Sequence, residues 1–319
     1  MNAKKFVSAF VLSAVMAAAA FAAEGTVTVK SLNSKREIVD VEVKANPAKV
    51  AILDLASLDI IDALGLGDTV VGSAGTRLSY LQKYVDGKLA NLGSIKQANL
   101  EATMAAEPDV IFSGLRLQKS YDALSEIAPN VMLTVDTKVG LVESVRANAT
   151  QIASLFGVEE KVAELMAGFD ARIAKLREIS AGKTAIVALV TSGGFNILGN
   201  DGRCGLIGKE AGFENIGLEG VTKKGEKGTT ATHGNEASFE FVLAKNPDYI
   251  FVMDRDAAIG AQGAKLAKEV VENELVMKTD AYKNGQIIYL ANPEVWYTAE
   301  GGITALDIML KDLESVLIK

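Results

Sequence analysis

The chain has 319 residues, which suggests two domains at a usual size of about 100–200 residues each. Its 40 acidic and 33 basic residues give a formal charge of −7, so there is no basic footprint for a nucleic-acid backbone and we expect no nucleic-acid partner. With 49% hydrophobic and 23% charged residues, the composition is that of a globular protein, which excludes disorder and fibres. A single cysteine, Cys204, and a single histidine, His233, exclude an internal disulfide and a zinc site of the usual Cys/His count.

Residues 1–22 have the pattern of a secretory signal peptide. Lys4 and Lys5 form a positive start, residues 6–20 are uncharged and mostly apolar, and Ala20-Phe21-Ala22 has the small-x-small pattern of a cleavage site. The apolar run is shorter than the ~20 residues that a membrane anchor needs, and no cysteine follows it as in a bacterial lipoprotein. We therefore expect cleavage after Ala22 and a soluble periplasmic protein.

From residue 23 to residue 140 the sequence alternates between strand and helix patterns. Residues 27–29 and 39–43 alternate between apolar and polar side chains, as in a β-hairpin. The other strands that we expect are 50–53, 70–72, 110–112 and 131–135. The helices that we expect between the later strands are 57–64, 100–106 and 119–127. Gly65 and Gly67 follow the first helix, as glycines often do where a helix ends. Such alternation predicts a mostly parallel sheet.

Residues 141–180 have helical periodicity and contain no proline, and the strand pattern restarts at 184–191. One helix of this length would span ~60 Å at a rise of 1.5 Å per residue, which is more than one small domain needs. We therefore expect one long linking helix, with a break near Gly157 as the alternative.

These patterns together predict an α/β fold of two Rossmann-like lobes with parallel sheets, joined by the long linking helix. The expected divisions are a signal peptide at 1–22, an N-terminal lobe at 23–140, the linking helix at 141–180 and a C-terminal lobe at 181–319.

An internal repeat lies on the two sides of the linking segment. Residues 99–112 align without gaps on residues 238–251, at a constant offset of 238 − 99 = 139. Eight residues after the proline of each copy comes an arginine, Arg116 in the first and Arg255 in the second, just past the end of a strand. Because ligands of open α/β sheets bind at the carboxyl ends of the strands, the repeat predicts a ligand cleft between the two lobes.

The sequence has no motif of a known catalytic site. It lacks G-x-S-x-G and a second histidine for a metal centre, and its glycine pairs after strands form neither G-x-G-x-x-G nor a Walker motif in the required context. We therefore expect a binding protein and not an enzyme, without a bound nucleotide.

Several motifs resemble the class III, or helical-backbone, substrate-binding proteins of ABC importers. They are the two helix-Pro-Asp-strand units, which begin Asn99-Leu-Glu101 and Ser238-Phe-Glu240, and the linking helix. Three further segments resemble sequences of the subgroup that binds ferric catecholate siderophores of the enterobactin and petrobactin type. They are Phe112-Ser-Gly-Leu-Arg116, Asn246-Pro-Asp-Tyr-Ile-Phe-Val-Met-Asp-Arg255 and Ile288-Tyr-Leu-Ala-Asn-Pro-Glu-Val-Trp296-Tyr297. The resemblance covers nearly the whole chain after the signal peptide.

The resemblance implies that the protein binds a ferric catecholate siderophore in the cleft between the lobes. It implies that Arg116, Arg203 and Arg255 face the ligand, and that His233 and Tyr297 complete the coordination of its iron. The Fe(III) belongs to the ligand, so no cofactor of the protein itself is expected.

The same resemblance implies a membrane partner. Glu101 and Glu240, each seven residues before the proline of its repeat, match the acids with which the family docks on the ABC transporter permease. The expected partners are therefore the siderophore and the permease of the inner membrane, and we expect a monomer.

The implied ligand agrees with the residue types. Fe(III) with three catecholates has a formal charge of 3 − 6 = −3, and three guanidinium groups would neutralise it with planar arrays of donors. If only two catecholates bind, two of the six coordination positions of iron stay open for a tyrosine oxygen and an imidazole nitrogen.

Simpler interpretations of these residues stay open at this point. An arginine after a strand often forms only a surface salt bridge, a histidine in a polar loop can be idle, a tyrosine beside a tryptophan can serve packing alone, and acids in the first turn of a helix are favoured by its dipole. A haem-binding protein of the same importer class is one alternative function, since His and Tyr are both axial haem ligands. A non-transport periplasmic interaction protein, or an enzyme on the same scaffold, is the other.

Overall fold

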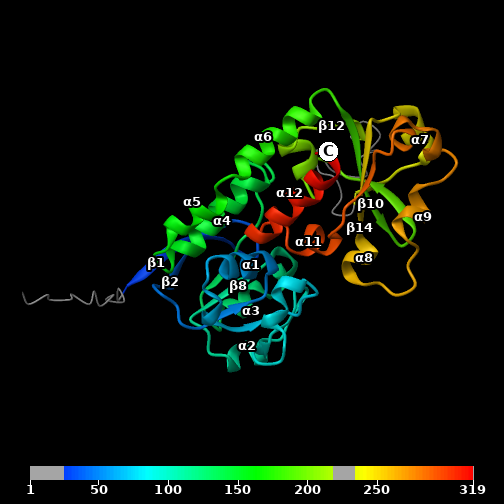
Figure 1. The fold of residues 1–319 in the computed structure, drawn as a ribbon. Helices are drawn as coiled ribbons and strands as arrows, with labels where there is room; N and C mark the ends of the chain where they lie inside the picture. Colours follow the sequence, from blue (N-terminus) through cyan, green and yellow to red (C-terminus); the bar gives the residue numbers. More distant parts are fainter. Residues whose placement is uncertain (1–24, 218–233, 319) are drawn as a thin grey trace, which may run out of the picture.

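The computed structural model describes residues 25–217 and 234–318 (Figure 1). The expected signal peptide with its cleavage site, and His233, lie outside these residues. Within the described ranges, no helix combines the length and the apolar character that a membrane span requires.

The first lobe is built on a parallel sheet of five strands. A hairpin precedes it, in which the antiparallel strands β1 (Thr26–Leu32) and β2 (Ile38–Lys44) pair over their whole length. The strands of the sheet, in spatial order, are β5 (Ala90–Asn91), β4 (Val70–Ser73), β3 (Val50–Ile52), β8 (Val110–Ser113) and β9 (Asn130–Met132). Every neighbouring pair in this sheet is parallel, as the alternation of strands and helices predicts.

Short helices connect these strands. The α-helices of the first lobe are α1 (Leu55–Ala63), α2 (Leu100–Ala105) and α3 (Tyr121–Ser125). The 3₁₀ helices are Gly67–Thr69, Ser79–Tyr84 and Leu115–Ser120, and a small pair of strands, β6 (Gly93–Ser94) and β7 (Gln97–Ala98), precedes α2. The expected helix at 119–127 is thus shorter and preceded by a 3₁₀ segment.

The linking segment consists of three consecutive helices, α4 (Leu141–Ser154), α5 (Glu159–Met166) and α6 (Phe169–Ser180), and not of one uninterrupted helix. Gly157 and Gly168 separate them, with φ angles of 62° and 87° that interrupt the right-handed helix and that glycine adopts without strain. The three helices still follow one another along one side of the molecule, against both lobes, so the segment keeps the role of a spine (Figure 1).

The second lobe contains a sheet of six strands. Most of its pairs are parallel, but β11 at one side of the sheet pairs with its neighbours in the antiparallel direction. The strands on the main path are β13 (Asn235–Glu236), β11 (Gly194–Ile197), β10 (Thr184–Thr191), β14 (Tyr249–Asp254) and β15 (Ile287–Tyr289), and β12 (Glu214–Asn215) also pairs with β10. Strand β10 is parallel to β12 and β14, as expected, but antiparallel to β11. A two-residue turn causes this reversal: Ser192 and Gly193 both have positive φ, as in the tight turns that favour hairpins.

Several helices follow in the second half of the chain. They are α7 (Phe239–Lys245), α8 (Arg255–Ile259), α9 (Ala267–Val271), α10 (Asp280–Lys283), α11 (Pro293–Thr298) and α12 (Ile303–Leu317), with a π-helical turn at Leu206–Glu210 and a 3₁₀ turn at Val276–Lys278. The expected α/β fold with two sheets is therefore confirmed. The residue boundaries of the two lobes stay a prediction.

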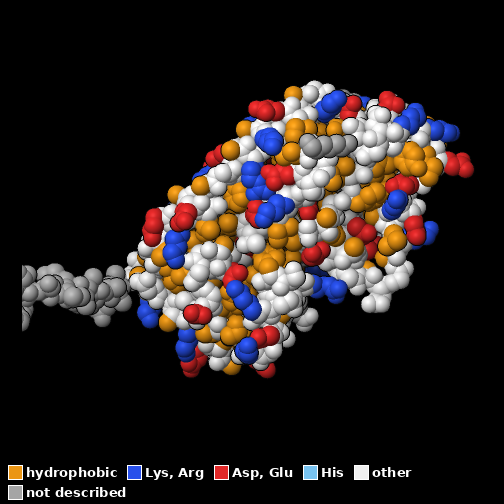
Figure 2. Space-filling model, in the orientation of Figure 1, with side chains coloured by type: hydrophobic (Ala, Val, Ile, Leu, Met, Phe, Trp, Pro, Cys, Tyr) orange, Lys and Arg blue, Asp and Glu red, His pale blue; other side chains and the backbone are white. Residues whose placement is uncertain are grey.

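One hydrophobic core runs through both lobes. Alternate residues of β10 belong to different clusters: Val187 and Leu189 join a core that extends through the spine to the first sheet, whereas Ile186 and Val190 face the outer helices. Both faces of this strand are therefore buried. The surface, in contrast, mixes acidic and basic side chains over the face shown in Figure 2.

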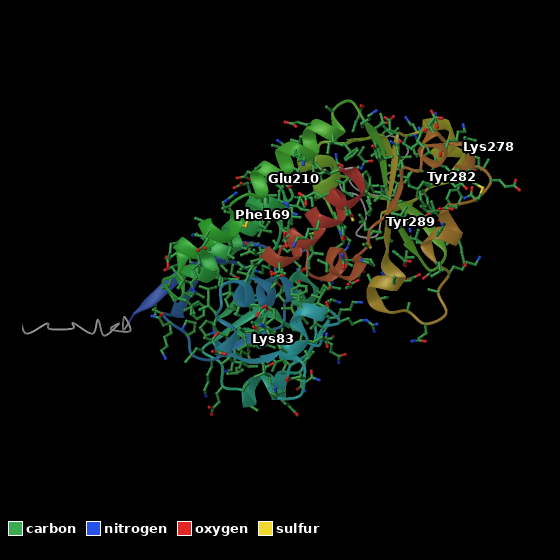
Figure 3. The ribbon with its side chains drawn as sticks, in the orientation of Figure 1. Lys83, Phe169, Glu210, Lys278, Tyr282 and Tyr289 are labelled. Atoms are coloured by element: carbon green, nitrogen blue, oxygen red, sulfur yellow. The ribbon has the colours of Figure 1, made fainter. Side chains whose placement is uncertain are left out.

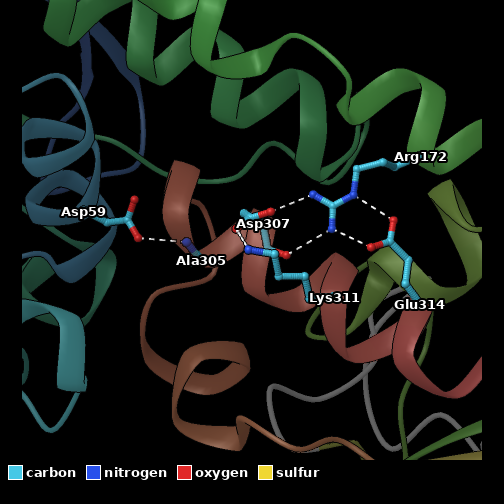
Figure 4. Close-up of polar contacts among 6 residues, drawn as sticks. All are labelled: Asp59, Arg172, Ala305, Asp307, Lys311 and Glu314. Carbon is cyan, nitrogen blue, oxygen red and sulfur yellow. Dashed lines mark hydrogen bonds and ion pairs between the residues drawn. The ribbon is translucent and has the colours of Figure 1, made fainter.

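Helix α12 joins the parts of this core. It packs against α1 of the first lobe and against α6 of the spine, and Arg172 of α6 binds Asp307 and Glu314 of α12 with N–O distances of 2.7 Å (Figure 4). At its N-terminus, the Asp59 carboxylate of α1 accepts hydrogen bonds from the backbone N–H groups of Thr304 at 2.8 Å and Ala305 at 2.9 Å. These are donors that the helix itself leaves unsatisfied.

The Asp59 carboxyl group is fully buried. Its burial raises its pKa from 3.8 to about 6, although a hydrogen bond from the Tyr80 hydroxyl at 2.7 Å and the two backbone donors favour the charged form. Between pH 4 and pH 6, Asp59 therefore keeps its proton in the folded protein, whereas in the unfolded chain it has already lost it. The contribution of Asp59 to stability is therefore complete below pH 4 and decreases as the pH rises to 6.

We predict that Asp59→Asn removes this pH dependence. In the wild type, the free energy of unfolding should lose about 3 kcal/mol between pH 4 and pH 6 through this group alone, at 1.36 kcal/mol per pKa unit. Urea unfolding at pH 4, 5, 6 and 7 measures it, with the exposed Asp122→Asn of α3 as a matched control. Parallel stability curves for wild type and Asp59→Asn would contradict the assignment.

Candidate functional site

A cleft of about 520 Å³ opens between the lobes. The first lobe contributes Asp54 and Arg116, which follow strands β3 and β8, and the second contributes Gly199 and Arg203 from the segment after β11. The end of α11, with Tyr297 and Thr298, and the turn that follows it, with Glu300 and Gly301, also line the cleft. The cleft thus lies at the carboxyl ends of the parallel strands of the first lobe, where open α/β sheets bind ligands.

Two carboxylates hold α11 and the start of α12 in place. Asp312 of α12 accepts hydrogen bonds from the Trp296 ring N–H at 2.9 Å and from the Asn292 side chain at 2.6 Å. Asp59 fixes the far end, where α12 begins. A Cβ atom at Gly302 would overlap the Asp59 carboxylate, so this close approach requires glycine.

The three arginines predicted from the sequence surround Tyr297. Arg116 Nη2 and Arg203 Nη1 donate hydrogen bonds to the backbone carbonyl of Tyr297 at 3.0 and 2.7 Å. Arg255 Nε donates to the Tyr297 hydroxyl at 3.1 Å. The guanidinium carbons of Arg116, Arg203 and Arg255 lie 5.8, 4.1 and 5.6 Å from the centre of the tyrosine ring. Four of the five predicted ligand-binding residues are therefore neighbours.

Arg255 differs from the other two arginines. It begins α8, and its Nη1 donates to the Thr191 hydroxyl at 3.0 Å and contacts Asp256 at 3.4 Å. Arg255 is not among the described residues that line the cleft. Its link to the site is its hydrogen bond to the Tyr297 hydroxyl. Arg116 and Arg203 line the cleft directly.

Burial governs the charges of the cleft. Desolvation, and next the neighbouring charge of Arg203, lower the pKa of the Arg116 guanidinium. The Nε of Arg203 is buried and has no hydrogen-bond partner among the described residues. The two guanidinium groups that line the cleft are donors for anionic oxygens, so the site is suited to an anionic ligand.

Two carboxyl groups in the cleft were not predicted from the sequence. Asp54 is the N-cap of α1, where it accepts a hydrogen bond from the Ser57 N–H at 2.9 Å, and burial raises its pKa. Glu300 is half-buried and faces Arg203, and burial raises its pKa to about 7. The order strand, Asp, helix marks Asp54 as a cap in the sequence. No local pattern marks Glu300.

Glu101 and Glu240 occupy equivalent places in the two lobes. Each lies in the first turn of its helix, after an N-cap side chain that accepts a backbone hydrogen bond, Asn99 for α2 and Ser238 for α7. Both glutamates are exposed, and neither lines the cleft. Their helices lie at the ends of the two lobes away from the α4–α6 spine (Figure 1). Their role in docking stays a prediction.

His233 lies outside the described residues, which resume at Gly234. A Cβ atom at Gly234 would meet the backbone of Ile197 at 2.5 Å, and Asn235 pairs with the same residue in the sheet. Strand β11 ends at Ile197 and continues into Leu198 and Gly199, which line the cleft. The described chain therefore resumes beside the edge of the cleft.

Known proteins resemble the chain over nearly its whole length. The petrobactin-binding protein YclQ of Bacillus subtilis (strain 168) is 33% identical over 327 residues, which cover 99% of this chain and 100% of that protein. Its crystal structure matches with a TM-score of 0.81 over 92% of this chain and 99% of the other. The ferric-anguibactin-binding protein FatB of Vibrio anguillarum is 26% identical over 84% of this chain and 81% of its own length.

A further solved structure is the periplasmic catecholate-siderophore binding protein VctP of Vibrio cholerae. It matches with a TM-score of 0.79 and 27% identity over 91% of this chain and 100% of the other. All three relatives are named as binding proteins, in agreement with the binding protein expected from the sequence.

Residues 50–294 match the model of the periplasmic binding protein family. This match spans both sheets, the spine and the cleft, and it agrees with the resemblance to substrate-binding proteins of ABC importers. The chain belongs to the periplasmic binding protein family.

Proposed function

We propose that the protein binds a ferric catecholate siderophore in the cleft and delivers it to the permease of an ABC importer. The observation that carries the proposal is the convergence of Arg116 and Arg203, one from each lobe, on one point of the cleft wall. The relatives support the ligand class, since one is named for petrobactin and another for catecholate siderophores. Iron is cargo in this proposal and not a cofactor of the protein.

The two convergent arginines of the cleft, Arg116 and Arg203, are suited to a compact polyanion. A ferric tris-catecholate carries a formal charge of −3, and its catecholate oxygens can accept hydrogen bonds from planar guanidinium groups. The Tyr297 carbonyl orients Arg116 and Arg203 without occupying all their donors, since each guanidinium has five N–H groups. The ligand then finds its donors already ordered, which lowers the entropy cost of binding.

Tyr297 is suited to complete the coordination of iron in a siderophore with only four oxygens. The hydrogen bond that Arg255 donates to its hydroxyl holds the ring in place, and tyrosine oxygen is a hard ligand for Fe(III). His233 is the second proposed ligand, on the segment that rejoins the described chain at the edge of the cleft.

The proposed location of the protein in the cell rests on its family and on the signal-peptide pattern of residues 1–22. Members of the family are extracytoplasmic binding proteins, and we propose that residues 1–22 direct export and are cleaved after Ala22. The mature protein would then act as a monomer in the periplasm. It would carry its ligand to the inner membrane, where Glu101 and Glu240 would contact the permease.

We predict that the loss of either cleft arginine weakens ligand binding. Arg116→Ala and Arg203→Ala should each cost about 2–5 kcal/mol of binding free energy with a ferric tris-catecholate, because each leaves a buried anionic oxygen without its partner. Arg→Lys should restore only part of the loss, since lysine lacks the planar fork. Titration of the fluorescence of Trp296, the one tryptophan of the chain, measures binding.

The exposed Arg36, which lines the rim of the same cleft, is the matched control for this series. Arg36→Ala should change the affinity much less and mainly alter its salt dependence. The proposal fails if the wild type does not bind ferric catecholates, or if Arg116→Ala and Arg203→Ala bind like Arg36→Ala. Absorption distinguishes the haem alternative, because haem gives a Soret band and a ferric catecholate gives a broad charge-transfer band.

A second prediction concerns iron ligation. Tyr297→Phe and His233→Ala should each weaken binding of a ferric bis-catecholate and shift its charge-transfer band, because a coordination bond to iron is lost. The same variants should bind a hexadentate tris-catecholate almost normally, since its iron is already saturated. Unchanged affinity and spectrum with the bis-catecholate would show that neither residue is a ligand.

A third prediction concerns the permease. The double variant Glu101→Ala/Glu240→Ala should bind the siderophore with an affinity within about twofold of wild type, because exposed charges remote from the cleft contribute little to ligand binding. Uptake of the iron complex by cells should fall. The exposed pair Asp122→Ala/Glu269→Ala is a control for the loss of two acidic charges. Normal uptake by the double variant would argue against docking through these acids.

A further inference from the structure

Glu300 occupies a junction between the cleft and a smaller cavity beside it. It follows α11, lines the cleft with Arg116 and Arg203, and also lines the small cavity with Lys209 and Glu210. Figure 3 shows Glu210 near the junction of the spine and α12. Glu300 therefore adjoins both the two cleft arginines and the smaller cavity.

The groups around Glu300 have opposite effects on the ionisation of its carboxyl group. Arg203 and, more weakly, Arg116 favour its ionised form, as does the backbone N–H of Cys204. Glu210 opposes ionisation, and its own Oε1 accepts a hydrogen bond from the N–H of Leu141 at the start of α4. The other nearby charges are engaged elsewhere or exposed. They are Lys209, which binds the Lys138 carbonyl at 2.9 Å, Asp54, which caps α1, and Arg36 and Asp201 at the rim.

We propose that Glu300 is a specificity-determining residue that sets the ligand charge the cleft accepts: its carboxylate is the internal counter-ion of Arg203 and Arg116, and it takes up a proton when a highly anionic ligand binds. The inference rests on the proposed function, since it assumes a ferric catecholate as the ligand. It adds a coupling between ligand binding and proton uptake at the same site.

The physical reason is competition for the same guanidinium groups. A ligand of charge −3 that binds Arg203 and Arg116 places negative charge near Glu300, and like charges disfavour a second ionised group. Burial has already raised the pKa of Glu300 to about 7, so the charged and neutral forms are close in free energy near neutral pH. A modest perturbation by the ligand is then sufficient to protonate the carboxylate.

The direction of the pH effect follows from linkage. The bound state holds the proton more tightly than the unliganded state, so binding is strongest where Glu300 is already neutral and weakens as the pH rises through 7. If the bound form is fully protonated, about half a proton is taken up per ligand at pH 7 and the affinity falls about fivefold between pH 7 and pH 8. A ligand of lower negative charge should cause less uptake.

Calorimetry with a preformed ferric tris-catecholate tests the proposal. Titrations at pH 7 in two buffers of different ionisation enthalpy give the number of protons taken up, and titrations at pH 8 give the change in affinity. The tris-catecholate is the appropriate probe because its iron is saturated, so Tyr297 has no reason to release a proton into the same measurement. The wild type should show the uptake of about half a proton and the fivefold loss.

Glu300→Gln keeps the shape of the side chain and removes the titration. It should take up no proton, bind with the same affinity at pH 7 and pH 8, and bind more tightly than wild type at pH 8. Glu300→Ala is a second neutral variant if the glutamine protein does not fold. The matched control is Asp201→Asn, which removes an exposed carboxylate from the same cleft and should keep the wild-type proton uptake.

The outcomes separate this inference from the function on which it rests. If the wild type does not bind the tris-catecholate, the proposed function fails. If it binds without proton uptake, or if the glutamine and alanine variants take up as much proton as wild type, the function stands and the role of Glu300 is wrong. Equal loss of uptake in Asp201→Asn would also overturn it, because the effect would then belong to the total charge of the cleft.

Discussion

The cleft depends on how the start of α12 is held against the first lobe. The buried Asp59 carboxylate binds the N–H groups of Thr304 and Ala305, and the segment just before them carries Tyr297 and Glu300. The Tyr297 carbonyl in turn orients an arginine from each lobe. A polar contact deep in the core thus helps to fix the point at which two positive charges meet.

Much of the architecture could be predicted from the sequence because its signals are local. Alternating strand and helix patterns indicated two α/β units, and the repeat placed Arg116 and Arg255 at the ends of equivalent strands. The linking segment was predicted as one helix because its apolar residues keep a helical spacing on both sides of Gly168. The positive φ of this glycine nevertheless interrupts the helix. The antiparallel strand β11 was not predicted, because the tight turn before it requires a positive φ at Ser192. A serine gives no indication of such a φ in the sequence.

The site was less accessible from sequence, for a physical reason. Arg203 and Tyr297 came from the family resemblance, since neither lies in the repeat and 94 positions separate them in the chain. Glu300 follows no motif, and its significance arises only from burial beside Arg203, a property of the folded state. The same holds for Asp59, whose partners at the start of α12 lie 245 and 246 positions away. Sequence patterns report short-range periodicity, whereas these contacts are made by tertiary packing.

The position of α12 also bears on the order of folding. The first lobe contains residue 59, yet the contacts of its helix α1 are completed by the last helix of the chain. Bringing these segments together closes a very long loop, which has a substantial entropy cost before any contact rewards it. Native packing therefore has to wait until the C-terminal helix has been synthesised. During synthesis, the Asp59 carboxylate stays without its two α12 partners until Thr304 and Ala305 have been made.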